Sequence, residues 1–193
     1  MINIEASDLR VKKTHRAIRN AFEELLMETD YDKLTVKALC ERAMINRKTF
    51  YAHYAYLDEL MEEYVNELSE TYIRERGPSH GFENLPTRIR LFFQYLPNVP
   101  PLAEKLVMSH SGIGFFDKVG AMILTIAPEE ISGIENTNPD VQRIILDYLN
   151  SACYTIYRSW ILGGKKLPPE ELSELAVTLI CGDMNAILHF IGM

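Results

Sequence analysis

The chain of 193 residues has few cysteines and lacks the long apolar runs of a membrane protein. Its three cysteines are far apart and form no CxxC pair or Cys/His ligand pattern, so we expect reduced thiols and no metal site. No apolar run approaches the ~20 residues that span a bilayer, and Glu5 and Asp8 interrupt the segment where a signal peptide would be apolar. We therefore expect a cytoplasmic protein without membrane contact.

Catalytic patterns are also missing. The sequence contains no Gly-rich phosphate loop, HExxH motif or EF-hand loop. Ser109 and Ser111 flank His110, but neighbours on a helix point in different directions and no GxSxG motif surrounds them. We expect no catalytic residues, no cofactor and no enzymatic activity.

Positive charge is concentrated in one part of an acidic chain. The formal net charge is −7. Residues 10–53 carry ten Lys and Arg against six Asp and Glu, a net charge of +4, whereas residues 54–193 carry ten against nineteen, a net charge of −9. A basic segment on an acidic chain favours contact with a polyanion such as nucleic acid. The alternative is an ordinary solvated run of charges.

The segment from Thr35 to Tyr54 predicts two short helices joined by a turn. Thr35 is a good N-cap in front of apolar residues at helical spacing, and Asn46 is a second N-cap. Helices this short, separated by a turn of about three residues, cross each other as in a helix-turn-helix. The outer face of the second helix is rich in donors suited to phosphates and base edges. These donors are Arg47, Lys48, Thr49, Tyr51 and His53.

The wider pattern resembles the TetR family of bacterial transcriptional regulators over about residues 10–65. The resemblance rests on the apolar helix positions Ile18, Ala21, Phe22, Leu25 and Leu26, the segments 31–36 and 49–54, and the string Asp58-Glu59-Leu60. Two positions depart from the family pattern. Met44 occupies a turn position that is usually Gly, and Leu57 occupies one that is often Lys. We expect Met44 to cost on the order of 1 kcal/mol if the turn is left-handed.

The rest of the chain predicts helices only, so the expected fold is all-α with about nine helices. By resemblance, residues 1–56 form a three-helix helix-turn-helix head, and residues 57–193 form a helical effector-binding and dimerisation body. Residues 57–76 are expected to be a connecting helix, residues 1–8 a loose arm and residues 77–81 a linker. The spacing of apolar residues predicts two long helices at the end, Pro139 to Leu162 and Pro169 to Ile191.

The resemblance implies a DNA-binding regulator: a repressor that binds a palindromic double-stranded DNA operator as a homodimer and is released by a small-molecule effector of unknown identity. The alternative is a helical protein-interaction module or co-activator whose head docks on a protein partner. Arg47 is expected to read a guanine, and the family places Thr49, Tyr51 and His53 near the DNA backbone; for Thr49 and Tyr51 the alternative is local packing. The expected DNA-contact residues are Thr35, Lys37, Asn46, Arg47, Lys48, Thr49, Tyr51 and His53.

Large aromatic and methionine residues in the middle of the body suit the lining of a small-molecule pocket, although a plain core has the same composition. The candidate pocket residues are Phe92, Phe93, Met108, Phe115, Phe116, Met122, Tyr148, Tyr154, Tyr157 and Trp160. The two last helices carry more apolar surface than a monomer should expose, and by resemblance they pair with a second copy. The alternative is that they complete the monomer core. The expected interface residues are Ile145, Leu149, Ile156, Leu175, Leu179, Met184, Ile187 and Leu188.

Overall fold

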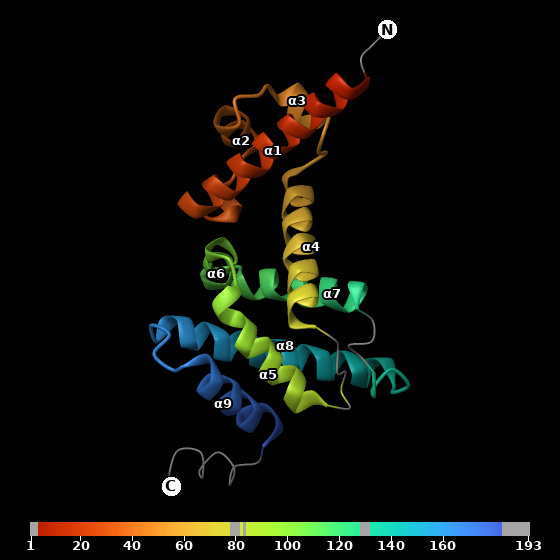
Figure 1. Ribbon diagram of the computed structural model, residues 1–193, viewed down its shortest axis with the longest axis vertical. Coiled ribbons are helices and arrows are strands. Elements are labelled where there is room, and N and C mark those ends of the chain that lie inside the picture. The colour runs from red at the N-terminus through yellow and green to blue at the C-terminus, as the bar shows by residue number, and fades with distance from the viewer. Residues whose placement is uncertain (1–3, 78–81, 83, 128–131, 183–193) are drawn as a thin grey trace. The chain divides into compact units, whose positions relative to one another are not determined.

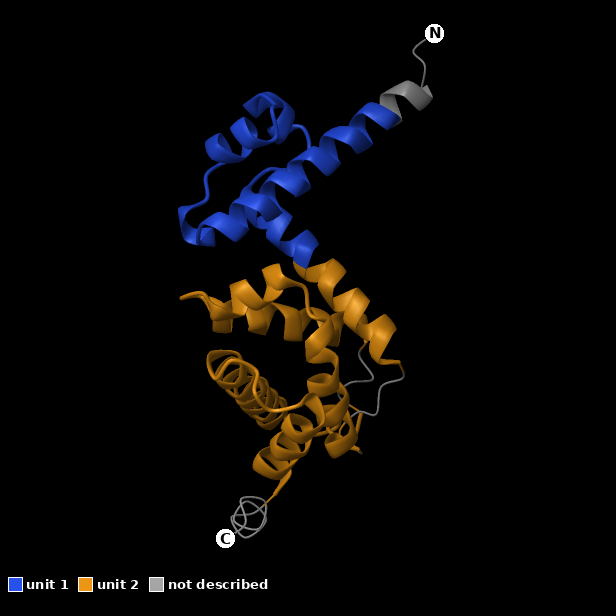
Figure 2. Cartoon of the chain, turned by 60° about the vertical axis from the view of Figure 1, so that its left-hand side comes forward, with its two compact units in different colours: residues 1–64 blue, residues 65–193 orange. Residues whose placement is uncertain are grey.

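The computed structural model describes residues 4–77, 82, 84–127 and 132–182, with side chains from residue 9 onward. These residues form nine α-helices, two short 3-10 helices and no strand, which confirms the predicted all-α fold. The chain divides into two compact units, residues 1–64 and 65–193, and the division falls inside helix α4 (Figure 2). None of the described helices is both long and apolar enough to cross a membrane.

The N-terminal unit is a small helical domain with its own apolar core. It contains α1 (Ile4–Glu28), the 3-10 turn η1 (Tyr31–Lys33), α2 (Val36–Arg42), α3 (Arg47–Tyr51) and the first part of α4 (Leu57–Arg76). Apolar residues recur every three or four positions on α1, so one face of this helix is buried. The most enclosed side chains of the unit are Ile18, Phe22, Leu26, Leu39, Phe50 and Leu60.

Helix α1 begins at Ile4, so the expectation of a loose arm over residues 1–8 is wrong for residues 4–8. The segment contains no Gly or Pro that would stop a helix.

The C-terminal unit is a stack of helices whose starts are set largely by proline. Helix α5 packs against α9, while α7 packs against α6 and α8 (Figure 1). Helices α6, α8 and α9 each begin at a proline, which lacks only an N–H group that the first turn would leave without an intrahelical partner. The elements are α5 (Leu85–Tyr95), η2 (Leu96–Asn98), α6 (Pro101–Met108), α7 (Gly112–Ile126), α8 (Pro139–Leu162) and α9 (Pro169–Cys181).

The two long terminal helices begin where the apolar spacing and the prolines predict. Helix α8 spans Pro139–Leu162 as expected, and α9 starts at Pro169. Helix α9 ends at Cys181, because its C-cap Gly182 has an extended backbone, so the expectation of one continuous helix from Pro169 to Ile191 is wrong at this point. Met184, Ile187 and Leu188 lie outside the described residues, as do residues 78–81 of the expected linker. The buried residues of this unit include Phe93, Leu106, Tyr157, Leu172 and Ala176.

Candidate nucleic-acid interface and internal cavity

Both predicted N-caps hold the starts of the two short helices. The Thr35 hydroxyl accepts a hydrogen bond of 3.1 Å from the Ala38 N–H at the start of α2. The Asn46 carboxamide oxygen accepts one of 2.8 Å from the Thr49 N–H and another of 3.0 Å from the Thr49 hydroxyl at the start of α3. The two bonds from backbone N–H groups each satisfy a donor that lacks an intrahelical partner. The caps therefore fix where α3 begins and which face it exposes.

The turn between α2 and α3 is left-handed at Met44. Its φ angle is +53°, in the region where L-residues other than Gly are strained. The Ile45 N–H donates to the Cys40 carbonyl over 3.0 Å and the Met44 N–H donates to the Glu41 carbonyl over 3.3 Å, the pairing of a Schellman motif. The Met44 side chain is 91% exposed, so no packing offsets the strain.

Helix α3 has one buried anchor and an exposed donor-rich face. Phe50 is completely buried, and its ring stacks on Tyr54 with 5.8 Å between centroids. Arg47, Lys48 and Tyr51 are exposed on the helix, and Thr49 is half-buried there. His53 is half-buried and lies beyond the end of α3 at Tyr51, so its expected place on the helix is wrong. The anchor thus sets the rotation of the helix, and the strongest donors of the predicted set point to solvent.

The other predicted DNA-contact residues lie in α2 and at the two N-caps. Lys37 of α2 is exposed and lies 3.9 Å from the Glu41 carboxylate. Thr35 and Asn46 are exposed too, but their side-chain oxygens accept the capping hydrogen bonds. The hydroxyl of Thr49 is held by Asn46. Their contact with DNA stays a prediction, and a contact by Thr35 or Asn46 would have to be compatible with the cap.

Glu63 of α4 joins three segments of the N-terminal unit. Its carboxylate accepts a 2.8 Å hydrogen bond from the Tyr54 hydroxyl, and it lies 3.2 Å from Nε2 of His15 and 3.5 Å from the Arg19 guanidinium. Burial of Tyr54, followed by its hydrogen bond to Glu63, raises the pKa of the phenol well above its ordinary value, so the group stays protonated and donates. One carboxylate therefore connects α4 to α1 and to the end of the helix-turn-helix.

Arg42 belongs to the basic segment by sequence but is engaged within the unit. Its guanidinium donates to Glu28 over 2.6 Å and lies 3.4 Å from Glu24. Both acids are on α1, so this pairing fastens α2 to the end of that helix. By contrast, Arg10 and Arg16 of α1 are exposed. Some basic residues of this unit therefore form ion pairs within it, and others are exposed to solvent.

Sequence reasoning missed Glu63, because Glu62, Glu63 and Glu67 all stand next to apolar residues and the sequence around them looks alike. One signal separates it from its neighbour: Glu63 follows Leu60 by three positions and therefore borders the buried stripe of α4, whereas Glu62 is exposed. The partner residues His15, Arg19 and Tyr54 lie far from Glu63 in sequence and carry no local signal.

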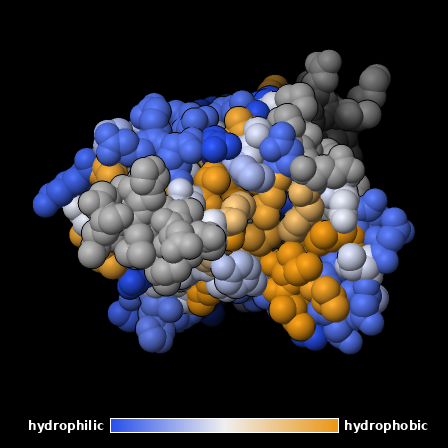
Figure 3. Space-filling view, turned by 90° about the horizontal axis from the view of Figure 1, so that it is seen from below, coloured by the Kyte–Doolittle hydropathy of each residue, from blue (hydrophilic) through white to orange (hydrophobic). Residues whose placement is uncertain are grey.

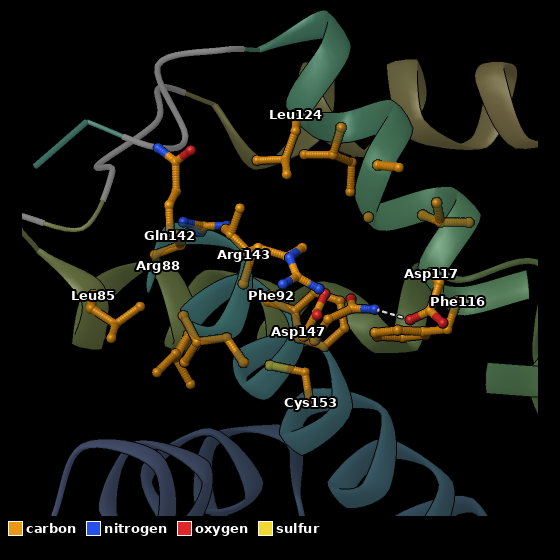
Figure 4. Close-up of a pocket in the computed structure, with 18 of the residues that line it drawn as sticks. Leu85, Arg88, Phe92, Phe116, Asp117, Leu124, Gln142, Arg143, Asp147 and Cys153 are labelled. Atoms are coloured by element: carbon orange, nitrogen blue, oxygen red, sulfur yellow. Dashed lines mark hydrogen bonds between the residues drawn. The ribbon is translucent and has the colours of Figure 1, made fainter. Parts of the chain in front are cut away.

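The C-terminal unit contains a cavity of about 540 Å³ between α5, α7 and α8, with Tyr72 of α4 in its wall (Figure 4). The volume is within the ~300–1,000 Å³ of small-molecule sites. Most of the lining is apolar. The polar and charged lining residues are Arg88, Asp117, Gln142, Arg143, Asp147, Asn150 and Cys153.

Gly120 allows α7 to approach α8 beside this cavity. A Cβ placed on Gly120 would lie 2.9 Å from the Asn150 side-chain oxygen, too close for an ordinary contact. Asn150 in turn donates a hydrogen bond to Asp117 on α7. Burial raises the pKa of the Cys153 thiol to about 12, so this group stays neutral at neutral pH.

The predicted pocket residues are distributed over three environments. Phe92 and Phe116 line the cavity, and their rings meet edge to face with 5.9 Å between centroids. Phe93, Phe115, Tyr157 and Trp160 are buried. Met108, Met122 and Tyr154 are half-buried, and Tyr148 is exposed on α8.

Helix α8 exposes apolar side chains in its first half. Val141, Ile144 and Tyr148 follow one another at helical spacing, and Ile144 is 62% exposed. Apolar residues are visible at the surface on the side of the molecule viewed from below (Figure 3). Of the predicted interface residues, Leu179 is exposed, and Ile145, Leu149, Ile156 and Leu175 are half-buried; Leu149 also lines the cavity.

Comparison with known proteins gives one consistent picture. Residues 18–64 match the sequence pattern of "Bacterial regulatory proteins, tetR family". An uncharacterized HTH-type transcriptional regulator of Bacillus subtilis (strain 168), YxbF, is 37% identical over 59 residues, which are 30% of this chain and 16% of that protein. The matched segment thus spans about a sixth of this relative's length.

A solved structure extends the likeness to the C-terminal unit. The crystal structure of a TetR transcriptional regulator from Streptococcus agalactiae 2603V matches with a TM-score of 0.67 at 22% identity, over 92% of this chain and 99% of the other. At this identity the match establishes the fold. The chain is of the helix-turn-helix class with an all-α body. Its helix-turn-helix segment has the sequence pattern of the TetR family, and the chain has the fold of a TetR transcriptional regulator.

Proposed function

We propose that this protein is a transcriptional repressor that binds a palindromic DNA operator as a homodimer and releases it when a small molecule binds the C-terminal unit. In this proposal residues 1–56 bind DNA, residues 57–193 bind the effector and dimerise, and residues 57–76 connect the two functions.

One observation carries the DNA-binding part. Helix α3 is fixed by the Asn46 cap and by the buried Phe50, and it directs Arg47, Lys48 and Tyr51 to solvent. A capped helix with donors in its first turn is what enters the major groove in helix-turn-helix proteins. Arg47 could donate two parallel hydrogen bonds to O6 and N7 of a guanine, a contact that discriminates by about 1–3 kcal/mol.

Gel-shift titration at several salt concentrations tests this part. We expect Lys48→Gln to reduce the slope of log affinity against log salt by about 1, because one phosphate neutralisation is lost. Lys166→Gln is the matched control, since Lys166 is an exposed lysine of the C-terminal unit. Absence of any salt-sensitive DNA retention would instead favour the alternative of a head that docks on a protein.

The exposed apolar residues of α8 support the homodimer. Val141, Ile144 and Tyr148 would be removed from water by a second copy, and an isologous interface needs such a self-complementary surface. Two heads could then contact two half-sites about one helical turn apart. Sedimentation at micromolar concentration should give about twice the chain mass of 22.2 kDa, and a monomer there would contradict the dimer.

The cavity supports the effector part, because a mostly apolar space of this volume is the usual form of a small-molecule site. A ligand regulates DNA binding only if it binds the DNA-competent and incompetent states with different affinity. Thermal-shift screening with gel-shift readout tests this. A ligand that stabilises the protein without changing DNA binding would contradict the sensor role.

A further inference from the structure

The first turns of α1 extend beyond the apolar core of the N-terminal unit. Val11 precedes Ile18 by seven positions and therefore lies on the same face of the helix. Ile18 is completely buried, whereas Val11 is 49% exposed. Residues 9–13 are all exposed, so the described residues cover no face of the helix over this stretch. This end of α1 is therefore accessible to a molecule outside the chain.

The accessible end of α1 begins beside the end of α3. The ring of His15 lies 5.7 Å from that of Tyr54 and 6.5 Å from that of His53, which follows the last residue of α3 by two positions. In Figure 1 the first turns of α1 extend past α3. At a rise of about 1.5 Å per residue, positions 9 and 15 are roughly 9 Å apart, less than the ~12 Å width of the major groove. When the groove holds α3, phosphates that border it are within reach of this end of α1.

Lys13 and Arg16 share an exposed face at this end of the helix. They are three positions apart, and Asn20 continues the same face one turn further on. Neither cation forms an ion pair with a described residue. The nearest acids along the sequence are Asp8, five positions before Lys13, and Glu23, seven positions after Arg16. The positions one helical turn from either cation have described side chains without an acid among them: 9, 10, 12, 17, 19 and 20.

The charge and apolar pattern of this end of α1 favours DNA over a membrane surface. Residues 9–22 carry five Lys and Arg and no Asp or Glu, in a chain whose formal net charge is −7. A surface of one sign attracts a polyanion such as the DNA backbone. The exposed apolar residues Leu9 and Val11 are two positions apart, which places them about 200° apart around the helix. The segment therefore lacks the single exposed apolar face with which a helix lies on a membrane.

We infer that Lys13 and Arg16 bind phosphates of the DNA beside the site that α3 contacts, as a second point of attachment outside α2 and α3. This inference rests on the proposed DNA-binding function and adds two residues of α1 to those that carry it. Arg16 can donate two parallel hydrogen bonds to one phosphate, and Lys13 acts as a point charge. Because phosphates carry no sequence information, the contact raises the affinity for every sequence alike and makes it more sensitive to salt.

Gel-shift titration of the full-length protein tests the inference on a duplex of arbitrary fixed sequence, about 40 base pairs or four helical turns long. Lys13→Gln/Arg16→Gln should reduce the slope of log affinity against log salt by about 1.8 for one head on the duplex, and by about twice that for two heads, since each lost phosphate contact removes about 0.9. For one head, the affinity advantage of the unmodified protein should shrink about 12-fold between roughly 50 and 200 mM KCl. Both side chains are exposed, so the helix content should stay unchanged.

Lys118→Gln/Lys166→Gln is the matched control, since it removes the same two charges from exposed positions of the C-terminal unit. Its slope should equal that of the unmodified protein. The inference is overturned if the two double variants have the same slope. It is also overturned if Lys13→Gln/Arg16→Gln keeps the full slope on DNA but loses binding to vesicles that contain phosphatidylserine, because the pair would then serve a membrane surface.

The same titration separates the contact by α1 from the proposed function. If the unmodified protein shows no salt-sensitive retention of DNA, the DNA-binding proposal is refuted and the contact by α1 with it. If the unmodified protein binds DNA and Lys13→Gln/Arg16→Gln retains the full slope, the contact by α1 alone is refuted. On the operator, the double variant should lose affinity by the same factor as on the arbitrary duplex. A larger loss on the operator would indicate a base contact and overturn the assignment to phosphates.

Discussion

Replacement of Glu63 by glutamine tests whether one carboxylate holds the helix-turn-helix against α4. The change keeps size and an acceptor oxygen and removes the charge. The carboxylate is 31% exposed and has three partners: the Tyr54 hydroxyl, Nε2 of His15 and the Arg19 guanidinium. Because hydrogen bonds to charged groups are roughly twice as strong as neutral ones, the Tyr54 bond should lose about 1 kcal/mol.

The Arg19 pair adds to that loss. It is partly exposed, and pairs of this kind contribute about 0.2–1 kcal/mol. We therefore expect Glu63→Gln to lower the free energy of unfolding of the N-terminal unit by about 1–2 kcal/mol, and to weaken DNA binding through looser positioning of α3. Glu62→Gln is the matched control because it removes the same charge from an exposed neighbouring position.

The assay exploits the single tryptophan. Trp160 lies in the C-terminal unit, so its fluorescence follows that unit during urea denaturation, while far-UV circular dichroism follows helices of both units. Glu63→Gln should shift the dichroism transition to lower urea and leave the fluorescence transition in place. Equal stability of Glu63→Gln and Glu62→Gln would refute the reasoning, as would a shift of the fluorescence transition alone.

Three further predictions concern the turn, an ion pair and the surface of α8. Met44→Gly should stabilise the N-terminal unit by up to about 1 kcal/mol in urea denaturation, since the relief of strain at positive φ exceeds the extra freedom of Gly in the unfolded chain, and Met44→Ala should give no such gain. Arg90 lowers the pKa of Glu174, so this exposed pair stabilises the C-terminal unit at pH values above the ordinary Glu pKa, and the stabilisation is lost as the pH falls through the lowered pKa. Arg90→Gln should therefore make the fluorescence transition depend less on pH on the acid side. Ile144→Asp should shift sedimentation from dimer toward monomer with unchanged helix content. Lys118→Asp, at an exposed position of α7, is the control, and a specific α8 interface is contradicted if this variant dissociates the dimer as well.

The extent of the helices was largely predictable from sequence because their signals are local. The caps at Thr35 and Asn46 and the proline at the start of α8 stand next to the residues they control. The start of α1 was placed too late, although residues 4–8 contain no Gly or Pro that would stop a helix. A resemblance to one family also placed the helix-turn-helix, since its motif is contiguous.

The Glu63 contacts and the cavity could not be predicted in the same way. His15 and Glu63 are brought together by the packing of α1 on α4, and no periodicity in either helix records the pairing. Aromatic composition likewise does not distinguish a cavity wall from a packed core. Phe92 and Phe116 face the cavity and Tyr157 is enclosed, although all three occupy apolar positions of helices. That difference depends on how far apart the helices are held.

The central claim is that the exposed face of α3 reads DNA sequence, and the affinities of the Arg47→Ala variant for operator and for random DNA test it most directly. Both are measured at several salt concentrations beside the unmodified protein. Base contacts carry sequence information and phosphate contacts do not, so we predict that Arg47→Ala loses about 1–3 kcal/mol on the operator and little on random DNA. Equal losses on both DNAs would make Arg47 a phosphate contact and contradict the claim.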